Sequence, residues 1–458
     1  MVYDDYLNQI LYSGPMLLPS IELPYQADSL TLFERFRQLD SPLLLDSGEG
    51  YRDRFDVIAA APVSSVRVMT GAADTERAFS QMRELLGPRP MVCTDPGPAP
   101  GWYGVWSYDL GSLSERVPLP RPDNPLPLLW MGFYPALIVL DHRARRAWLR
   151  YLPAHQSLAR RLQKIYEGPA SAGHPAGRFR LQSPFRGNLM ATEYQQRFAR
   201  VQDYIRAGDC YQVNLARRFQ AQYAGDPWDA YRRLRRAHSA PMGAFLQVED
   251  WALMSLSPER FIRCWQSQVE TRPIKGTRPR SGDPLEDRGR RQELLSSLKD
   301  RAENLMIVDL LRNDLGRSCE PGSVQVPELF ALESFSNVHH LVSTVQGRLR
   351  PELDPLDLIW RAFPGGSITG APKHRAMEII AELEPAPREF YCGSLVYLDV
   401  TGTLDSSILI RSLVARNATI RCWGGGGIVA DSVAEQEFQE IRHKVGSFLK
   451  SLTQTSDL

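Results

Sequence analysis

The sequence predicts a large protein of mixed α/β structure, and three observations lead to this prediction. The chain has 458 residues with 43% hydrophobic content, enough to bury one large core or two moderate ones. Residues 1 to about 150 contain short apolar runs bounded by turn residues, which is typical of β-strands. From about residue 190, strand-like runs alternate with helix-like patterns.

The first 188 residues divide into two regions. Apolar runs at 43–45, 56–60 and 136–140 predict strands, and the N-terminal region is taken as 1–150. Residues 151–188 begin with a basic stretch and pass into a run of Gly, Pro, Ala and Ser. We therefore expect a linker or long surface loop there.

The region 189–452 carries the clearer periodic patterns. Thr192 and Gln195 have the spacing of a capping box, which predicts a helix that ends before Gly208. Further strands are expected near 211–220, 243–248, 252–256, 260–264, 395–399, 406–415 and 418–422. Further helices are expected near 227–237, 286–313, 355–361, 372–383 and 432–451.

Charge and cysteine usage exclude several classes of protein. With 54 Lys+Arg against 53 Asp+Glu, the chain has no long-range attraction to nucleic acid or to an anionic membrane. Its six cysteines are scattered without metal-ligand spacing, which indicates a reducing cytoplasm. No stretch approaches the roughly 20 apolar residues of a membrane helix, and the first residues lack the pattern of a signal peptide.

Lys275 is the most informative single residue. It lies in Thr-Arg-Pro-Ile-Lys-Gly-Thr, a stretch that reads as buried, and Gly276 allows backbone or ligand to approach closely. Such a lysine could act as a nucleophile, although a solvated loop lysine is the simpler interpretation of this residue alone. Glu259 follows a predicted strand and could act as a general acid or base; the alternative is a surface turn.

Two predicted helices carry candidate metal ligands. Helix 299–313 has apolar residues in all directions, so Glu303 is expected near the interior, where it needs a cation, a proton or a buried arginine. On the last helix, Glu437, Glu440 and Lys444 line a stripe beside the apolar face. Glu440 and Lys444 could simply form a solvated salt bridge. Magnesium, however, takes one or two carboxylates plus other oxygens, which Glu303 and Glu440 could supply.

Two glycine-rich segments and a pair of histidines are the remaining candidates for a functional site. Residues 363–373 are similar to a phosphate loop, but Gly370 is followed by Ala371 and not by lysine and Ser/Thr as in the Walker motif. Free backbone N–H groups at the start of the following helix could bind an anion such as a carboxylate; the alternative is a plain tight turn that caps the helix. Four glycines at 424–427 suggest a ligand against the main chain rather than a flexible loop. His339 and His340 would face opposite sides of a strand, and one of them could carry a proton; a core histidine is more common.

Taken together, these blocks resemble the chorismate-utilising enzymes. The resemblance is strong from about 190 to 450 and runs through GDCYQVNLA, SLSPERF, TRPIKGT, DRAENLMIVDLLRNDLGR, VHHLVST, FPGGSITGAPKHRAMEII, SSILIRSL and GGGGIVADS. Anthranilate-forming members look like PIAGT where this chain has Lys275. Isochorismate- and salicylate-forming members carry a water-activating lysine where this chain has Gln212. The resemblance therefore implies amino transfer to C4 of chorismate, in p-aminobenzoate and folate biosynthesis.

The resemblance also implies a fold and residue roles. The fold is an anthranilate synthase component I-like sandwich of two mainly antiparallel sheets with helices outside. Glu303 and Glu440 hold Mg²⁺ against a chorismate carboxylate. Lys275 attacks C2, Glu259 protonates the departing C4 hydroxyl, and His340 orients groups or handles protons. Substrate-holding positions are Thr277, Gly370, Ala371, Tyr397, Arg411, Gly425, Gly426, Gly427 and Lys444.

Ammonia needs a source, and Cys210 in Gly-Asp-Cys-Tyr does not fit a glutaminase nucleophile. The resemblance implies a separate glutamine amidotransferase subunit as partner. Relatives also hold tryptophan in a pocket beside the N-terminal sheet, and Met242 here replaces a more usual aromatic residue. The matching positions are Ser47, Arg54, Phe55, Pro241 and Met242.

Two rival functions remain open at this point. The first is anthranilate formation from chorismate, against which Lys275 argues. The second is a non-catalytic subunit that binds tryptophan or chorismate, against which the joint presence of Lys275, Glu259, Glu303 and Glu440 argues.

Overall fold

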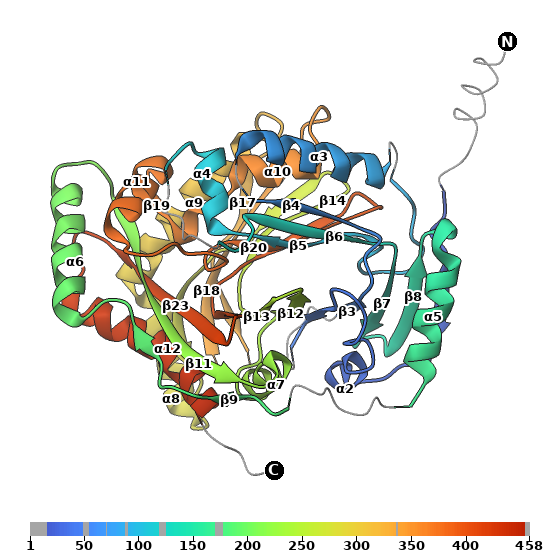
Figure 1. Cartoon of the computed structure of the whole chain (residues 1–458). Coiled ribbons are helices and arrows are strands. Elements are labelled where there is room, and N and C mark those ends of the chain that lie inside the picture. The colour runs from blue at the N-terminus through green and yellow to red at the C-terminus, as the bar shows by residue number, and fades with distance from the viewer. Residues whose placement is uncertain are drawn as a thin grey trace.

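The computed structural model describes residues 16–48, 55–69, 71–87, 90–118, 125–169, 177–335 and 338–453. Two large antiparallel sheets lie against each other, and the helices lie on their outer sides (Figure 1). The expected α/β fold with two antiparallel sheets is therefore confirmed. Both sheets contain strands from the first 150 residues and from the region after 189.

The first sheet has thirteen strands among the described residues. Its long strands β11 and β23 pair along ten residues, and β9 and β19 also pair with β11. In spatial order the strands are β1 (Ser20–Leu23), β8 (Arg146–Tyr151), β7 (Ala136–Asp141), β3 (Phe55–Ala59), β2 (Leu43–Asp46), β12 (Met242–Val248), β13 (Trp251–Ser257), β22 (Ser412–Arg416), β23 (Thr419–Ile428), β11 (Gln212–Ala224) and β10 (Arg186–Gly187), with β19 (Gly370–Ala371) and β9 (Arg180–Leu181) beside β11.

The second sheet has ten strands within the same described ranges. In spatial order they are β16 (Ile274–Pro279), β18 (Val338–Arg348), β15 (Gln268–Thr271), β14 (Arg260–Trp265), β21 (Leu404–Ile408), β20 (Ser394–Asp399), β5 (Gly101–Trp106), β6 (Leu129–Tyr134) and β4 (Ser64–Val68), with β17 (Gln325–Ser334) beside β18.

The helices cover the outside of this pair of sheets. In Figure 1, α3, α4 and α10 lie along one side, α2 and α7 along the opposite side, and α5 at one end. The α-helices are α2 (Ser29–Phe33), α3 (Ala72–Leu86), α4 (Gly111–Ser114), α5 (Gln156–Glu167), α6 (Ala191–Arg206), α7 (Pro227–Ala237), α8 (Pro284–Ser296), α9 (Leu298–Gly316), α10 (Pro355–Ala362), α11 (Lys373–Leu383) and α12 (Ala434–Thr453); the short 3₁₀ helices are η1 (Tyr108–Leu110), η2 (Pro153–His155) and η3 (Gly366–Ile368).

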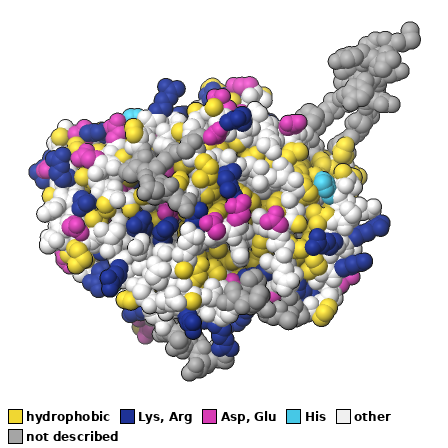
Figure 2. Space-filling model, in the orientation of Figure 1, with side chains coloured by type: hydrophobic (Ala, Val, Ile, Leu, Met, Phe, Trp, Pro, Cys, Tyr) yellow, Lys and Arg dark blue, Asp and Glu magenta, His cyan; other side chains and the backbone are white. Residues whose placement is uncertain are grey.

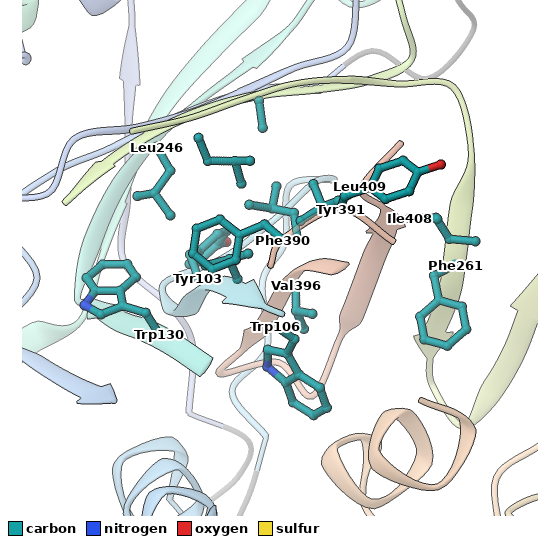
Figure 3. Packing of buried hydrophobic residues seen from close by; sticks show 14 of the residues in the cluster. Tyr103, Trp106, Trp130, Leu246, Phe261, Phe390, Tyr391, Val396, Ile408 and Leu409 are labelled. Atoms are coloured by element: carbon teal, nitrogen blue, oxygen red, sulfur yellow. The ribbon is translucent and has the colours of Figure 1, made fainter. Parts of the chain in front are cut away.

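A core rich in aromatic side chains joins the two sheets. Trp130 of β6 and Trp251 of β13 meet edge to face with ring centroids 6.1 Å apart, one from each sheet. Figure 3 shows Leu246 of β12 close to rings from the second sheet, including Tyr103 and Trp130. Burial of such large apolar surfaces is the main stabilising contribution to a fold of this size. On the outside, Figure 2 shows basic and acidic side chains interspersed over one face.

Three expected elements differ from the structure. The expected linker 151–188 contains helix α5, because Ala159, Leu162 and Tyr166 form an apolar face that packs inward. The expected helix 286–313 is two helices, since Ser297 leaves the helical conformation and its side chain caps α9 by accepting from the N–H of Asp300. The expected strand 406–415 is likewise two strands, β21 and β22.

The sequence suggested that helix α9 is apolar on all sides, but the structure shows that it is not. Ile307, Val308 and Leu311 are buried, whereas Leu305 is 46% exposed. The carboxylate-bearing face that includes Glu303 is therefore half-exposed rather than enclosed. Among the described residues, no helix is both long enough and apolar enough to cross a membrane.

Candidate active site

Lys275 lies in a β-bulge of strand β16. Ile274 pairs with Val342 and Thr277 pairs with His340, so β16 has one residue more than β18 between these pairs. Gly276 adopts φ +79°, and a Cβ there would lie 2.8 Å from Leu294. Bulges re-aim side chains and often occur next to active sites. The expected burial of this stretch is only partly correct, because Lys275 is half-buried and Thr277 is exposed.

Ser367 connects Lys275 to Glu259. The Lys275 ammonium donates to the main-chain oxygen of Ser367 at 3.4 Å, and the Ser367 hydroxyl donates to Oε1 of Glu259 at 3.3 Å. Ser367 belongs to the short helix η3 inside the glycine-rich segment that the sequence singled out. The structure therefore brings this segment, the lysine and the acid together around one buried serine.

Glu259 has the protonation behaviour of a general acid. It lies between β13 and β14 and is 7% exposed, so the surface-turn alternative is wrong. Burial raises its pKa to about 7, while the charge of Lys275 and the Ser367 hydroxyl act in the opposite direction. Near neutral pH, this carboxyl group can therefore hold a proton and release it.

His340 is buried beside Thr277, two residues after Lys275, and is neutral near pH 7. Its Nδ1 lies 2.9 Å from the hydroxyl of Thr277 across the β16–β18 pair. Burial and the nearby charge of Arg411 lower its pKa to about 4. His339 faces the opposite side, where it contacts Asp287 at 3.0 Å. His340 can orient groups as a neutral imidazole, but it carries no charge at neutral pH.

Glu303 and Glu440 come from two helices, and their charges influence each other. Burial raises the pKa of Glu303, Lys275 and Lys299 lower it, and Glu440 raises it. Burial also acts to raise the pKa of Glu440, but the ammonium of Lys444, 2.7 Å away, holds it below its usual value. The salt bridge that the sequence offered as an alternative is therefore present, and it lies in the same charged group as Lys275 and Glu303.

This donor set fits Mg²⁺ and does not resemble a complete metal cage. No group of three or more His, Cys, Asp or Glu side chains within the described ranges could hold a metal ion. Two carboxylates that repel each other attract a divalent cation, and Mg²⁺ completes its shell with water and substrate oxygens. Glu437, one turn before Glu440, is a further carboxylate here, buried and accepting from the Ser432 hydroxyl at 2.8 Å.

The four glycines form the second half of strand β23, not a loop. A Cβ on Gly424 would lie 2.7 Å from Val445, and one on Gly426 would lie 2.6 Å from Glu437 Oε2. β22 pairs only with Thr419–Cys422, so it ends before the glycine half of β23 begins. Lys444 reaches this half and donates to the oxygen of Gly425 at 3.2 Å.

The remaining substrate positions lie around the same strand, with one exception. Gly370 and Ala371 form β19, which pairs with β11 beside β23. Arg411 is exposed and immediately precedes β22, close enough for its charge to lower the pKa of His340. Tyr397 is the exception, because it stacks on Tyr103 with centroids 5.2 Å apart and lines a different cavity.

Tyr391 has the placement that was expected of Tyr397. Its hydroxyl would lie 3.1 Å from a Cβ on Gly425, and its ring is parallel to that of Trp423 at 6.2 Å. Figure 3 shows its hydroxyl pointing away from Phe390 and Trp130. The sequence offered two tyrosines six residues apart and no pattern that separates them. Ser367 was also missed, although it lies in a segment that the sequence singled out. Glu437 was named on the last helix, but only Glu440 was expected to bind the metal.

The expected tryptophan positions lie around the cavity that Tyr397 lines. This cavity has a volume of about 760 Å³ and lies between β2, β3 and β12 of the first sheet and β5, β14, β20 and β21 of the second. Ser47, Phe55, Pro241 and Met242 line it, whereas Arg54 lies outside the described residues. It is separate from the group around Lys275, whose residues do not line it.

Comparisons with known proteins identify the family of this chain. The sequence pattern of the chorismate binding enzyme family matches residues 40–450. The chain is 45% identical to aminodeoxychorismate synthase component 1 of Klebsiella aerogenes, over 95% of this chain and 100% of that protein. It is 44% identical to the Escherichia coli K12 protein of the same name, over 92% and 95%. Anthranilate synthase component I from Streptococcus pneumoniae matches its fold with a TM-score of 0.76 at 29% identity, over 88% of this chain and 93% of that one. This chain therefore belongs to the family of chorismate-binding enzymes.

Proposed function

We propose that this chain converts chorismate and ammonia to 4-amino-4-deoxychorismate, as its relatives named aminodeoxychorismate synthase component 1 do. The observation that carries the proposal is the contact of Lys275 and Glu259 with one serine, Ser367. A lysine nucleophile and a proton donor are thereby held on either side of a single residue.

The reaction proceeds in two displacements. The lone pair of Lys275 Nζ, in its free amine form, makes a bond to C2 as the ring double bonds shift and the C4–O bond breaks, and the Glu259 carboxyl donates its proton to the departing hydroxyl, giving water. Ammonia then bonds to C4, the C2–N bond to Lys275 breaks, and the Glu259 carboxylate takes a proton from the new amine. A carboxyl with a pKa of about 7 suits both directions of transfer.

The other residues of the site bind the substrate. Glu303 and Glu440 would hold Mg²⁺, which would supply positive charge for a chorismate carboxylate. Lys444, Arg411 and the main chain of the glycine strand β23 hold the carboxylates of chorismate. Tyr391 takes the place that the sequence suggested for Tyr397. A glutamine amidotransferase subunit supplies the ammonia, in keeping with the "component 1" in the names of the relatives.

Product analysis tests this function directly. Purified chain, chorismate, Mg²⁺ and an ammonium salt should give 4-amino-4-deoxychorismate by chromatography and mass spectrometry. Lys275→Ala should abolish the product, whereas Lys450→Ala, at an exposed position of α12, should not. Anthranilate, detected by its fluorescence, would instead place the chain in the anthranilate branch, and the absence of any turnover would support a binding subunit.

We propose that the cavity lined by Tyr397, between the two sheets, binds tryptophan. Its polar and apolar lining and its volume of about 760 Å³ are in the range of small-molecule sites. Calorimetric titration with L-tryptophan, compared with a Met242→Arg variant that fills the cavity, tests this assignment. Equal heats for both proteins would contradict it.

A further inference from the structure

A buried arginine, Arg388, lies between helix α11 and strand β20 and is 1% exposed. Its Nε and Nη2 atoms donate to the two carboxylate oxygens of Glu384, at 2.9 and 2.7 Å. A buried ion pair adds little to stability by itself, because the hydration that its charges lose offsets their attraction. The remaining hydrogen bonds of Arg388 therefore indicate what it does in this fold.

The other hydrogen bonds of Arg388 reach two segments of the candidate active site. Its Nη1 donates to the main-chain oxygen of Ile368 at 2.9 Å, and its Nη2 donates to that of Asn214 at 2.6 Å. Ile368 directly follows Ser367 in the short helix η3. Asn214 lies on strand β11 and pairs with Gly427 in the glycine half of β23. One guanidinium therefore joins the segment that carries Ser367 to the strand beside the glycines.

Arg388 is itself held in place from two further sides. The N–H of Ala216, on strand β11, donates to Glu384 Oε1 at 2.8 Å and so fixes the carboxylate that Arg388 binds. The guanidinium carbon lies 4.5 Å from the ring centroid of Tyr108, which is buried and comes from the N-terminal region. The planar guanidinium has five N–H donors in fixed directions, which lets one side chain serve a carboxylate and two main-chain oxygens at once.

The segment that Arg388 holds is the one that contacts both reacting side chains. The main-chain oxygen of Ser367 accepts from Lys275 at 3.4 Å, and its hydroxyl donates to Glu259 at 3.3 Å. Both distances are at the long end for hydrogen bonds, so a small displacement of this segment breaks them. The spacing of Lys275 and Glu259 therefore depends on where the main chain at Ser367 is fixed.

We propose that Arg388 is a positioning residue for the first displacement: its hydrogen bonds fix the main chain at Ser367 and thereby the spacing of Lys275 and Glu259. This inference rests on the function proposed above. Arg388 forms no bond to the substrate and takes up no proton, and it acts through the segment that it holds. A misplacement of about 1 Å between reacting groups lowers a rate about 100-fold, so the loss of this support should appear in the chemical step.

Arg388→Lys tests the proposal because it keeps the positive charge and changes the hydrogen bonds. A lysine ammonium can stay beside Glu384, but as a point charge it cannot serve two carboxylate oxygens and two main-chain oxygens in one plane. Lysine adduct formation from chorismate and Mg²⁺ without ammonia, followed over time by intact mass, should be about 100-fold slower at saturating chorismate. The chorismate concentration for half the maximal rate should stay within about twofold, since the pairing of β11 with β23 holds the glycine strand without Arg388.

The pH dependence of the same step separates a positioning role from a loss of stability. Burial raises the pKa of Glu259, while the charge of Lys275, the Ser367 hydroxyl and the N–H of Ile274 hold it to about 7. Displacement of Ser367 weakens the first two of these contacts, so the pKa of Glu259 rises. The fall in the adduct rate at high pH should therefore move to higher pH in Arg388→Lys. A variant that is only less stable would keep the fall at the wild-type pH.

Arg37→Lys is the matched control for this substitution. Arg37 is likewise buried and donates to both carboxylate oxygens of Asp226, at 2.6 and 2.8 Å, at the start of helix α7. Arg37→Lys should lower the stability of the fold and leave the rate of adduct formation and its pH dependence unchanged.

Two other variants decide the question if Arg388→Lys does not fold. Arg388→Met combined with Glu384→Gln removes both charges, so neither is left buried without a partner. Tyr108→Leu removes only the ring against the guanidinium. Each folded variant should form the adduct more slowly than wild type, with the fall in rate at a higher pH.

A wild-type adduct rate and pH profile in any folded Arg388 variant would overturn the positioning role and leave the proposed function intact. If both Arg388 variants fail to fold, wild-type kinetics in Tyr108→Leu would overturn that role in the same way. A wild-type enzyme that neither forms the lysine adduct nor makes the amino product would overturn both the positioning role and the proposed function.

Discussion

Glu259→Gln should stabilise the protein at alkaline pH while it abolishes activity. The pKa of Glu259 is raised from 4.5 to about 7, chiefly by burial. Between these two values the folded protein keeps a proton on Glu259 that the unfolded chain has released. The free energy of unfolding therefore falls as the pH rises through this window, and the whole penalty is present above pH 7.

The size of this effect follows from the shift in pKa. A shift of about 2.5 units at about 1.36 kcal/mol per unit corresponds to about 3 kcal/mol. Glutamine cannot ionise and can still accept the hydrogen bond from Ser367, so the variant lacks the penalty. We expect the gain in unfolding free energy from Glu259→Gln to be about 2 to 3 kcal/mol larger at about pH 8.5 than at about pH 5.

Urea unfolding at the two pH values measures this difference, and amino-product formation in parallel measures the loss of activity. Glu352→Gln, at an exposed position, provides the matched control and should show no such pH dependence. A stability difference for Glu259→Gln that is the same at both pH values would show that Glu259 does not carry a raised pKa. The assignment of this residue as the proton donor near pH 7 would then lose its physical basis.

Three further predictions concern the surroundings of the site. Gly426→Ala brings a Cβ to 2.6 Å from Glu437 Oε2 and should raise the Mg²⁺ concentration needed for half-maximal activity several-fold. Gly282→Ala, with open space around it, should leave that concentration unchanged. The same Mg²⁺ concentration for both variants would refute the idea that the new methyl group crowds Glu437. Because His340 has a pKa of about 4, it stays neutral as the pH rises from about 6 to 8. His340→Asn should therefore lower the rate without moving the inflection of the pH–rate profile near pH 7. A shift of that inflection in the variant would contradict this assignment. Buried Lys373 donates to the buried carboxylate of Asp314 at 2.8 Å, so Lys373→Met leaves Asp314 without its cation and should lower the urea-unfolding free energy by about 3 to 5 kcal/mol. A loss below about 1 kcal/mol would show that the two charges do not form a buried pair.

Helices whose start and end are marked by capping residues or proline could be predicted from a few neighbouring residues. Helix α7 has its expected bounds because Asp226 caps it and Pro227 occupies its first position. The expected helix 286–313 missed its break at Ser297, although Ser297 and Asp300 have the spacing of a capping pair. Helix α5 was missed because its many basic residues obscured a narrow apolar face of three residues.

Contacts between residues far apart in the chain could not be predicted from the sequence, and the site depends on them. Lys275 and Glu259 stood out by type and neighbours, yet their link through Ser367 joins residues about a hundred positions apart in the chain. No local pattern indicated that Tyr391, rather than Tyr397, faces the glycine strand. Tyr391 lies before β20 and stacks on Trp423 of the first sheet, whereas Tyr397 lies within β20 and stacks on Tyr103 of the second.

The most direct test of the central claim is the intact mass of the protein after mixing with chorismate and Mg²⁺ in the absence of ammonia. Attack by Lys275 with loss of the C4 hydroxyl predicts an added mass equal to chorismate less water, absent from Lys275→Ala. No added mass in the wild-type protein, together with anthranilate once ammonia is supplied, would contradict the covalent lysine route and leave Lys275 without its proposed role.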